Sequence, residues 1–356
     1  MKIQAQHYRT IWREEQTVCI IDQTQLPFAL VIERIQTHTQ MCHAIRSMQV
    51  RGAPLIGAAA AFGMVLGIQQ DASDQNLQLV GNQLTATRPT AVNLAWAVQR
   101  MLKHLFAVSV ANRADASWEF AQAIADEDVA QNLAMGQHGK ALIAEQAATK
   151  SGQTINILTH CNAGWLATVD GGTALAPIYA AHDAGIQVHV WVDETRPRNQ
   201  GASLTAWELA QHGVPHTVIT DNAGGHLMQH GQVDLVIVGA DRVTSNGDVC
   251  NKIGTYLKAL AAYDQNIPFY AAVPTPSIDW QLATGADIEI EMRDADEVAY
   301  TQGQGQDGQI QQVRVIPHES QALNPAFDVT PARLVSGIIT ERGIYHPDKL
   351  QHTQIG

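Results

Sequence analysis

Residues 153–273 alternate short apolar runs with helical segments, and this alternation constrains the fold more than any other feature of the chain. Strand, helix and strand at such spacing form βαβ units, which build a parallel sheet covered by helices on both faces. We therefore predict an α/β region whose ligands bind at the carboxyl ends of its strands. The expected strands are "INILTH", "IQVHVWVDE", "VPHTVIT", "VDLVIVGA" and "PFYAAV".

The N-terminal part of the chain has a helical pattern instead. After a short β-like start, apolar residues in "PTAVNLAWAVQRMLKHLF" recur every three or four positions, which is the period of a helix. The segment "APLIGAAAAFGMVLGIQQ" is long enough for a buried helix, and residues 115–150 continue the pattern. Because 356 residues suggest two domains, we predict a mainly helical domain with a short β start at residues 1–148. An α/β domain would follow at residues 149–356.

The charge balance limits the partners of the chain. The net charge is −12, whereas a nucleic acid or an anionic membrane requires clustered Lys and Arg. We therefore expect neither as a partner. The four cysteines lack the spacing of a zinc ribbon and fit a reducing compartment. With no signal-peptide pattern and no apolar run of the ~20 residues that span a bilayer, we expect a soluble cytoplasmic protein.

Cys161 follows the first expected strand, in the glycine-rich segment "THCNAGW". The thiol can be a nucleophile, a metal ligand, a redox switch or a small side chain that fits. Adjacent residues at a strand end point in opposite directions, so we do not expect His160 to activate Cys161 directly.

Two further polar residues follow later strands. Asp241 comes after the strand that ends at Gly239. A carboxyl group there, among apolar neighbours, can act as a general acid, but it can equally cap the loop or pair with Arg242. Gln200 can donate and accept hydrogen bonds, as a sugar hydroxyl requires, or it is simply a polar residue at a helix start. The spacing leaves these alternatives open.

Three basic residues stand beside expected helix starts. In "RGAP", Arg51 precedes a helix whose first turn holds Pro54, where the missing N–H of proline is tolerated. "TRPT" and "NKIG" place Arg88 and Lys252 in the same way. Helix N-termini with a neighbouring cation bind anions. We therefore predict a phosphate-bearing ligand, against the alternative that these are solvated surface charges.

The sequence gives little support for a metal or a dinucleotide. His226 and His230 are four residues apart, but no further ligand stands at a suitable spacing. Glycines in residues 303–308 match GxGxxG, yet they follow no strand and open no helix, as a dinucleotide site requires. We predict a hairpin or loop at residues 302–314.

Six segments together resemble the methylthioribose-1-phosphate isomerase family. Its superfamily also includes ribose-1,5-bisphosphate isomerases and the regulatory α, β and δ subunits of a translation-initiation exchange factor. The resemblance spans residues 50–343, nearly the whole chain. The segments are "VRGAPLIGAAAAFG", "TRPTAVNLAWAV", "ILTHCNAGWLAT", "VWVDETRPRNQGASLTAWEL", "VGADRVTSNGDVCNKIGTY" and "NPAFDVTPARLVSGIITERG".

The resemblance implies a helical N-terminal domain joined to a Rossmann-like catalytic domain, usually as a homodimer, with no metal and no nucleotide cofactor. The implied reaction turns 5-methylthioribose 1-phosphate into 5-methylthioribulose 1-phosphate in methionine salvage. Asp241 would be the general acid, and Cys161 an acid/base or a stabiliser of the transition state. The implied substrate contacts are Arg51, Gly52, Ala53, Arg88, Gln200, Asn251 and Lys252.

The resemblance also implies that glycines near Cys161, namely Gly164, Gly171 and Gly172, let the backbone approach a sugar phosphate. One segment, "IEIEMRDADEV", departs from the commoner "IPIEER" of the family. Three alternatives are a ribose-1,5-bisphosphate isomerase, which needs a second phosphate site, a non-catalytic regulatory subunit, and a redox sensor that pairs Cys161 with Cys250.

Overall fold

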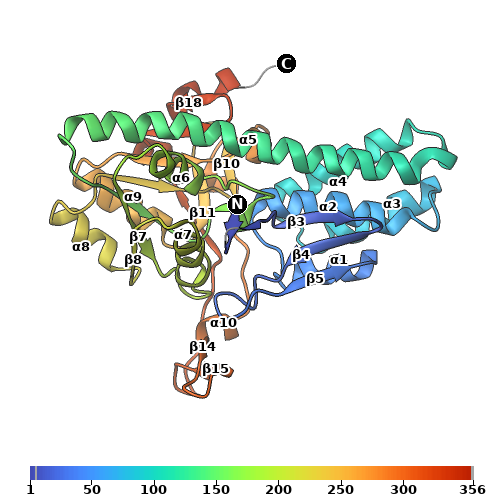
Figure 1. Ribbon diagram of the computed structural model, residues 1–356, viewed down its shortest axis with the longest axis horizontal. Coiled ribbons are helices and arrows are strands. Elements are labelled where there is room, and N and C mark those ends of the chain that lie inside the picture. The colour runs from blue at the N-terminus through green and yellow to red at the C-terminus, as the bar shows by residue number, and fades with distance from the viewer. Residues whose placement is uncertain (5, 354–356) are drawn as a thin grey trace.

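A computed structural model describes residues 1–4 and 6–353 of the chain. A helical region and an α/β region lie side by side, and one long helix runs along both (Figure 1). This mixed α/β architecture is the predicted fold class. The last three residues of the predicted C-terminal domain, 354–356, lie outside the described residues.

The N-terminal region starts with short antiparallel strands and continues as a helical cluster. Helix α2 is buried almost all round from Leu55 to Ile68, as a helix that is apolar on every face must be. The strands are β1 (Lys2–Ile3), β2 (Gln6–His7), β3 (Ile11–Glu14), β4 (Thr17–Ile21) and β5 (Ile32–Ile35). The helices are α1 (His38–Arg46), α2 (Ala53–Ile68), α3 (Asp74–Thr85) and α4 (Val92–Phe106).

Helix α5 (Arg113–Thr149) connects the two regions. Its first half adds Trp118 and Ile124 to the core around α2, and its second half adds Met135 and Ile143 to the core beside the large sheet. Gly139 lies so close to Pro177 of the following helix that a Cβ would overlap the proline ring. The helix therefore packs against both regions.

The large sheet has seven strands in the order β18-β17-β12-β9-β6-β7-β8, parallel except for β18. All five strands predicted from the sequence are present in it. Their bounds are β6 (Ile155–Thr159), β7 (Val188–Asp193), β8 (His216–Ile219), β9 (Leu235–Val238) and β12 (Phe269–Ala272), followed by β17 (Gly337–Thr340) and β18 (Gly343–Tyr345). The helices between them are α6 (Leu175–Asp183), α7 (Ala206–His212), α8 (Ala223–Gln229) and α9 (Thr255–Asp264).

Both faces of this sheet are buried, as a parallel sheet requires. Along β9, Leu235 and Ile237 pack into the core on one face, and Val236 and Val238 pack into the core on the other. The period of two explains why "VDLVIVGA" is apolar throughout.

The order of strands defines where a ligand would bind. From β6 the chain proceeds outward through β7 and β8, and then returns to place β9 on the opposite side of β6. Such a reversal opens a crevice at the carboxyl ends of the two central strands. Cys161 follows β6 and Asp241 follows β9, so both residues lie at this crevice.

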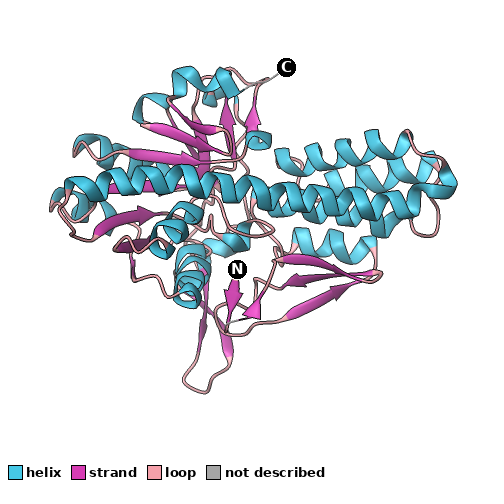
Figure 2. Cartoon of the chain, turned by 45° about the horizontal axis from the view of Figure 1, so that its top comes forward, coloured by secondary structure: helices cyan, strands magenta, loops and turns pink. Residues whose placement is uncertain are grey.

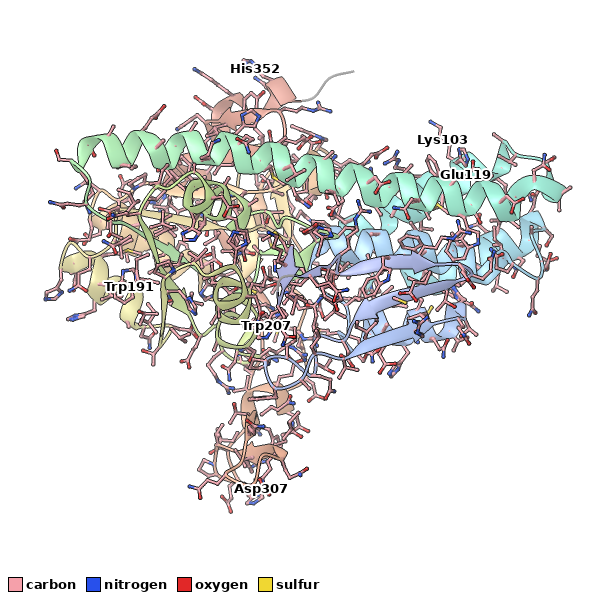
Figure 3. All side chains as sticks on the ribbon, in the orientation of Figure 1. Lys103, Glu119, Trp191, Trp207, Asp307 and His352 are labelled. Carbon is pink, nitrogen blue, oxygen red and sulfur yellow. The ribbon has the colours of Figure 1, made fainter. Side chains whose placement is uncertain are left out.

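A smaller sheet and a projecting hairpin complete the fold (Figure 2). The smaller sheet joins β13 (Ile278–Asp279), β10 (Arg242–Thr244), β11 (Val249–Lys252) and β16 (Phe327–Thr330). After the short helix α10 (Asp296–Ala299), strands β14 (Tyr300–Gln304) and β15 (Ile310–Arg314) form the hairpin predicted at residues 302–314. Figure 3 labels Asp307 at its tip. Across the described residues, no helix combines the length and the apolar character needed to cross a membrane.

Candidate active site

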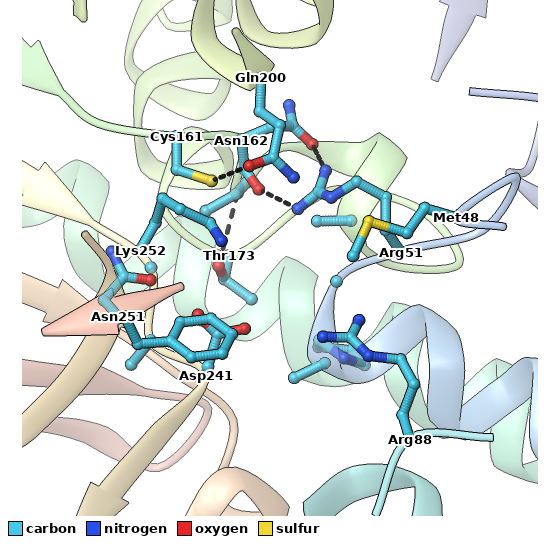
Figure 4. A pocket seen from close by; sticks show the side chains of 18 residues that line it. Met48, Arg51, Arg88, Cys161, Asn162, Thr173, Gln200, Asp241, Asn251 and Lys252 are labelled. Atoms are coloured by element: carbon cyan, nitrogen blue, oxygen red, sulfur yellow. Dashed lines mark hydrogen bonds between the residues drawn. The ribbon is translucent and has the colours of Figure 1, made fainter. Parts of the chain in front are cut away.

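A pocket opens at the crevice between β6 and β9 (Figure 4). Its empty volume is about 580 Å³ with the open mouth included. The N-terminus of α2 and the turn before α4 form the opposite wall. The lining residues are Met48, Arg51, Gly52, Ala53, Pro54, Arg88, Cys161, Asn162, Ala163, Ala167, Thr173, Gln200, Gly239, Ala240, Asp241, Asn251, Lys252 and Phe327.

The structure brings all nine residues of the predicted site to this one pocket. The sequence analysis missed Met48, Asn162, Thr173 and Phe327. Asn162 directly follows Cys161, and Phe327 lies in the quoted segment "NPAFDVTP", so their neighbours in sequence gave the available signal. The roles of the nine residues remain predictions.

Cys161 lies in a backbone conformation that side chains rarely adopt, with φ at 65°. Two hydroxyl groups hold it there. The Cys161 amide donates to Thr195 Oγ1 at 2.8 Å, and Thr205 Oγ1 donates to the Cys161 carbonyl at 2.7 Å. The thiol then points to Gln200, with Sγ 3.4 Å from Oε1. A strained residue that is held on both sides is typical of functional sites.

Burial raises the pKa of the Cys161 thiol, while the positive charges of Arg51 and Lys252 oppose the rise. The thiol therefore carries its proton at neutral pH. Only 7% of the residue is exposed, and the surface that remains faces the pocket. The site thus presents a neutral, protonated sulfur group to a ligand.

Asp241 faces the same space from the end of β9 (Figure 4). Its amide donates to the Cys250 carbonyl at 2.9 Å, which fixes the backbone. Burial raises the pKa of its carboxyl group, against the charges of Lys252, Arg88 and Arg51. Arg242 bonds to Thr90 and Asp279 instead. The alternative of an Asp241–Arg242 pair is therefore wrong.

As predicted, His160 points away from Cys161. Its Nδ1 lies 2.8 Å from Asp193 Oδ2 and its Nε2 lies 2.8 Å from the Ile253 carbonyl oxygen. Asp221 lies near these two side chains. Among the described residues, His160, Asp193 and Asp221 form a group whose side-chain atoms are close enough to bind one metal ion. Lys258 Nζ is 3.1 Å from Asp193 Oδ2, so this buried group already contains a cation.

Arg51 and Lys252 are buried cations on opposite sides of the pocket. Arg51 donates from Nη1 to Asn162 Oδ1 at 2.6 Å and from Nη2 to the Asn162 carbonyl at 2.8 Å. Lys252 Nζ lies 4.5 Å from the centre of the Phe327 ring, a cation–π contact. Positive charge therefore surrounds the space that Cys161 and Asp241 face.

The prediction for "NKIG" is confirmed in part, because α9 begins at Thr255 directly after this segment, although Lys252 itself ends strand β11. The prediction for "TRPT" was wrong, because Arg88 precedes a turn and α4 begins only at Val92. Arg88 Nη2 donates to Glu291 Oε2 at 3.1 Å, and its buried Nε has no partner among the described residues. Glu291 belongs to the segment "IEIEMRDADEV" that departs from the family pattern, so this segment reaches the pocket through Arg88.

The prediction for "RGAP" is confirmed, because α2 begins at Ala53 directly after Gly52. Gly52 has φ at 92°, and a Cβ there would lie 2.5 Å from the Ala167 carbonyl oxygen. Only glycine fits at this contact between the two halves of the pocket wall.

The glycines after Cys161 do not face the pocket, contrary to our prediction. A Cβ on Gly164 would overlap the Glu208 carboxyl group, and a Cβ on Gly172 would overlap the backbone of Gly164. Gly171 lies against Asn132. They allow close packing within the protein, while Gly52 and Gly239 line the pocket.

Two further pairs from the sequence, Cys161 with Cys250 and His226 with His230, were considered as a redox pair and as metal ligands. Cys161 and Cys250 are unbonded, and burial raises the pKa of Cys250 to about 12. A buried thiol that stays protonated oxidises slowly, which disfavours a redox sensor. His230 Nδ1 lies 2.8 Å from the His226 carbonyl oxygen on α8, so this pair is explained by a helix-end contact.

Comparison with known sequences gives a consistent result. The sequence profile of the initiation factor 2 subunit family matches residues 49–347. A methylthioribose-1-phosphate isomerase of Acidiphilium cryptum is 61% identical over 348 residues, which cover 97% of this chain and 94% of the relative. One of Rhizobium meliloti is 58% identical over 351 residues, which cover 98% and 96%.

Solved structures match over nearly the whole chain as well. The crystal structure of 5-methylthioribose 1-phosphate isomerase from Pyrococcus horikoshii has a TM-score of 0.83 at 40% identity and covers 98% of this chain and 95% of that one. The crystal structure of the translation initiation factor eIF-2B, subunit delta, from A. fulgidus has a TM-score of 0.81 at 38% identity, with 96% and 97% covered.

Proposed function

The chain belongs to the initiation factor 2 subunit family and, within it, to the methylthioribose-1-phosphate isomerases, and we propose that it converts 5-methylthioribose 1-phosphate to 5-methylthioribulose 1-phosphate. One observation carries the proposed chemistry. Cys161 and Asp241, both with raised pKa, face one pocket that also contains Arg51, Arg88 and Lys252. Two buried acidic groups whose burial favours the protonated form, next to clustered positive charge, suit acid/base chemistry on a phosphate ester.

The phosphate group would bind among the three cations and the N-terminus of α2. A helix N-terminus carries partial positive charge. The Nε of Arg88, which has no hydrogen-bond partner in the described part of the chain, supplies a donor that an anion would satisfy. Burial lowers the pKa of Lys252, while the neighbouring Cys161 and Asp241 oppose the change. A bound phosphate would favour the charged form of this lysine further.

Asp241 would act as the general acid. The phosphate on C1 prevents the sugar ring from opening to a free aldehyde unaided. A protonated Asp241 gives its proton to the ring oxygen as the bond from this oxygen to C1 breaks. Hydrogen then moves from C2 to C1, by an enediol or by a hydride shift, and the C2 hydroxyl loses its proton to form the ketone. The Asp241 carboxylate would take this proton back.

Cys161 would assist the transfer of hydrogen between C2 and C1. Its protonated thiol is a neutral, largely buried group at the pocket wall, which suits donation of a proton or stabilisation of developing charge. Gln200, which already receives the thiol hydrogen bond, and Asn251 would bind sugar hydroxyl groups.

A second cavity adjoins the pocket past Met48 and Gln200, and the methylthio group of the substrate would extend toward it. Leu26 and Phe28 contribute apolar surface to it, and Arg198 in its wall is already paired with Glu297 at 2.9 Å. We further propose, from the family resemblance, a role in methionine salvage, a cytoplasmic location, a homodimer, and the division into domains at residues 148 and 149.

A direct assay tests the proposed function. The purified protein is given 5-methylthioribose 1-phosphate, and the ketose signal is followed by NMR. Ribose 1,5-bisphosphate serves as the matched control, and we expect turnover of the first compound only. Turnover of the bisphosphate with a higher kcat/KM would identify the other isomerase class. Binding of both compounds without turnover would support a regulatory subunit.

A further inference from the structure

Within residues 1–4 and 6–353, the side-chain hydrogen bonds of Arg51 go to a single neighbour, Asn162. Both of its terminal nitrogens donate to Asn162, one to the side-chain oxygen at 2.6 Å and one to the backbone carbonyl at 2.8 Å. The first contact exists only while the amide oxygen of Asn162 faces Arg51. A rotation of the amide by half a turn would present its NH₂ group to the guanidinium, and two donors repel.

The orientation of that amide is set from behind the pocket. Asn162 Nδ2 donates to Glu208 Oε1 at 2.8 Å and to Thr205 Oγ1 at 3.2 Å. Burial raises the pKa of Glu208 to about 7, but all four groups that face its carboxyl group donate to it, so its oxygens act as acceptors here. Glu208 therefore draws the NH₂ group toward itself and leaves the amide oxygen directed at Arg51.

Glu208 receives three further hydrogen bonds from the same part of the chain. The amides of Trp165 and Leu166 donate to it at 2.8 and 3.0 Å, and the Tyr179 hydroxyl donates at 3.0 Å. The side chain is fully buried and does not line the pocket. The chain bends closely around it at Gly164, where a Cβ would overlap the carboxyl group.

We propose that Glu208 is a positioning residue for substrate binding, which acts through Asn162 to hold Arg51 in place. Glu208 comes from α7, Asn162 from the turn after β6, and Arg51 from the turn before α2. One buried carboxyl group thus links the sheet side of the pocket to its helical side. In the proposed function, Arg51 binds the phosphate of the substrate. The inference therefore rests on that function wherever the test measures KM.

The test compares Glu208→Met with Glu208→Gln. Methionine has no acceptor for Asn162, whereas glutamine keeps one oxygen for it. We expect Glu208→Met to raise KM by about tenfold or more with kcat little changed, since a hydrogen bond to a charged group is worth roughly that factor. Glu208→Gln should restore KM to within roughly threefold of the original protein. The affinity for inorganic phosphate, measured by calorimetry, should follow the same order.

The same substitution made in the Asn162→Ala variant distinguishes an effect on the position of Arg51 from a general loss of stability. In Asn162→Ala, the link to Arg51 is already cut, so adding Glu208→Met should lower the melting temperature again but leave KM unchanged. Additive effects on KM in the two backgrounds would overturn the proposal. Tyr179→Phe is the matched control, because it removes one donor to Glu208 without touching Asn162, and its KM should stay the same.

The outcomes distinguish this inference from the proposed function. If the original protein turns over 5-methylthioribose 1-phosphate and a folded Glu208→Met keeps its KM, the positioning role is wrong and the function stands. If the original protein shows no turnover, the function is wrong, and the phosphate affinities still decide the positioning role. Should Glu208→Met fail to fold, Glu208→Asp withdraws the carboxyl group from Asn162 while keeping its charge, and an unchanged KM there would also refute the proposal.

Discussion

At the scale of single residues, Asp241 carries the strictest chemical requirement, because a general acid must hold a proton at the pH of the reaction. Burial raises its pKa in that direction. Asp241→Asn keeps the shape of the side chain and removes the proton. We expect substrate affinity within about threefold of the original and turnover lower by ~10² or more. Steady-state kinetics and calorimetry check this, with Asp264→Asn at the exposed end of α9 as control. Near-normal turnover would exclude the acid role.

Cys161 makes a separate prediction. Cys161→Ser preserves the strained backbone and the hydroxyl groups that hold it, but replaces the thiol by a weaker acid. We expect kcat to fall by at least ~10²-fold, the usual scale for a group that transfers a proton. Cys42→Ala, which removes a buried thiol on α1 that does not line the pocket, is the control. A mild effect at Cys161 would reduce its role to packing.

The residues that follow β6 and β9 were predictable because a strand end fixes where the next side chain lies. Residues that position the pocket side chains from outside the pocket were not predictable in this way. Glu208 reads in the sequence as one polar residue on a helix, and its four hydrogen bonds come from residues 29 to 46 positions away. The glycines after Cys161 show the same limit. A glycine in the sequence indicates that another group lies close to the backbone, but not whether this group is a ligand or another part of the protein.

At the scale of elements, helix α5 contains a buried carboxyl group at Asp128. Burial raises its pKa to about 7, although the Val169 amide at 2.7 Å and Asn132 Nδ2 at 3.0 Å favour the charged form. In the unfolded chain the pKa is ~3.9, so the native state binds this proton more tightly. The stability that the protonated group contributes is fully present below the lower value and is lost as the pH rises through about 7.

Asp128→Asn should remove this pH dependence. Both hydrogen bonds end on Oδ2, so the asparagine oxygen can accept both of them. We expect the free energy of unfolding to change less between pH 5 and 8 than in the original protein. Above pH 7 the variant should be the more stable by about 1–4 kcal/mol, since one pKa unit corresponds to ~1.4 kcal/mol.

Urea unfolding at several pH values measures this difference. Asp126→Asn on the same helix is the control, because Asp126 is half exposed and pairs with Arg9 at the surface. Its stability curve should run parallel to that of the original protein. A parallel curve for Asp128→Asn as well would contradict the prediction.

Elements with a strong period were predictable, and short elements built by distant pairing were not. The apolar runs of β6 to β9 are visible in the sequence. The first half of β11 pairs with the nearby β10, but Asn251 and Lys252 are in a strand because they pair with β16, Asn251 opposite Asp328. No local pattern reveals a partner so far along the chain. Lys252 was therefore predicted at a helix start.

At the scale of the whole molecule, α5 bears on the proposed domain division. A cut at residue 149 removes Met135 and Ile143 from the core beside the large sheet. We expect a fragment of residues 149–356 to lack cooperative unfolding, since its sheet exposes apolar surface. A fragment of residues 130–356 keeps this half of the helix and should unfold cooperatively. Thermal unfolding followed by circular dichroism compares the two. Equal cooperativity would show that α5 is dispensable for the sheet region.

Periodicity in the sequence predicted the helix at residues 115–150, but it did not predict which of the two cores each half of α5 joins.

The wide spread of the pocket residues has a consequence for the order of events in folding. The walls come from residues between Met48 and Phe327, and two of the three cations, Arg51 and Arg88, precede Asp241 by more than 150 positions. Contacts between residues so far apart in sequence form late, after local helices and hairpins. During refolding, the circular dichroism signal of the helices should therefore recover before enzymatic activity, which reports only on molecules that have completed the last long-range closure.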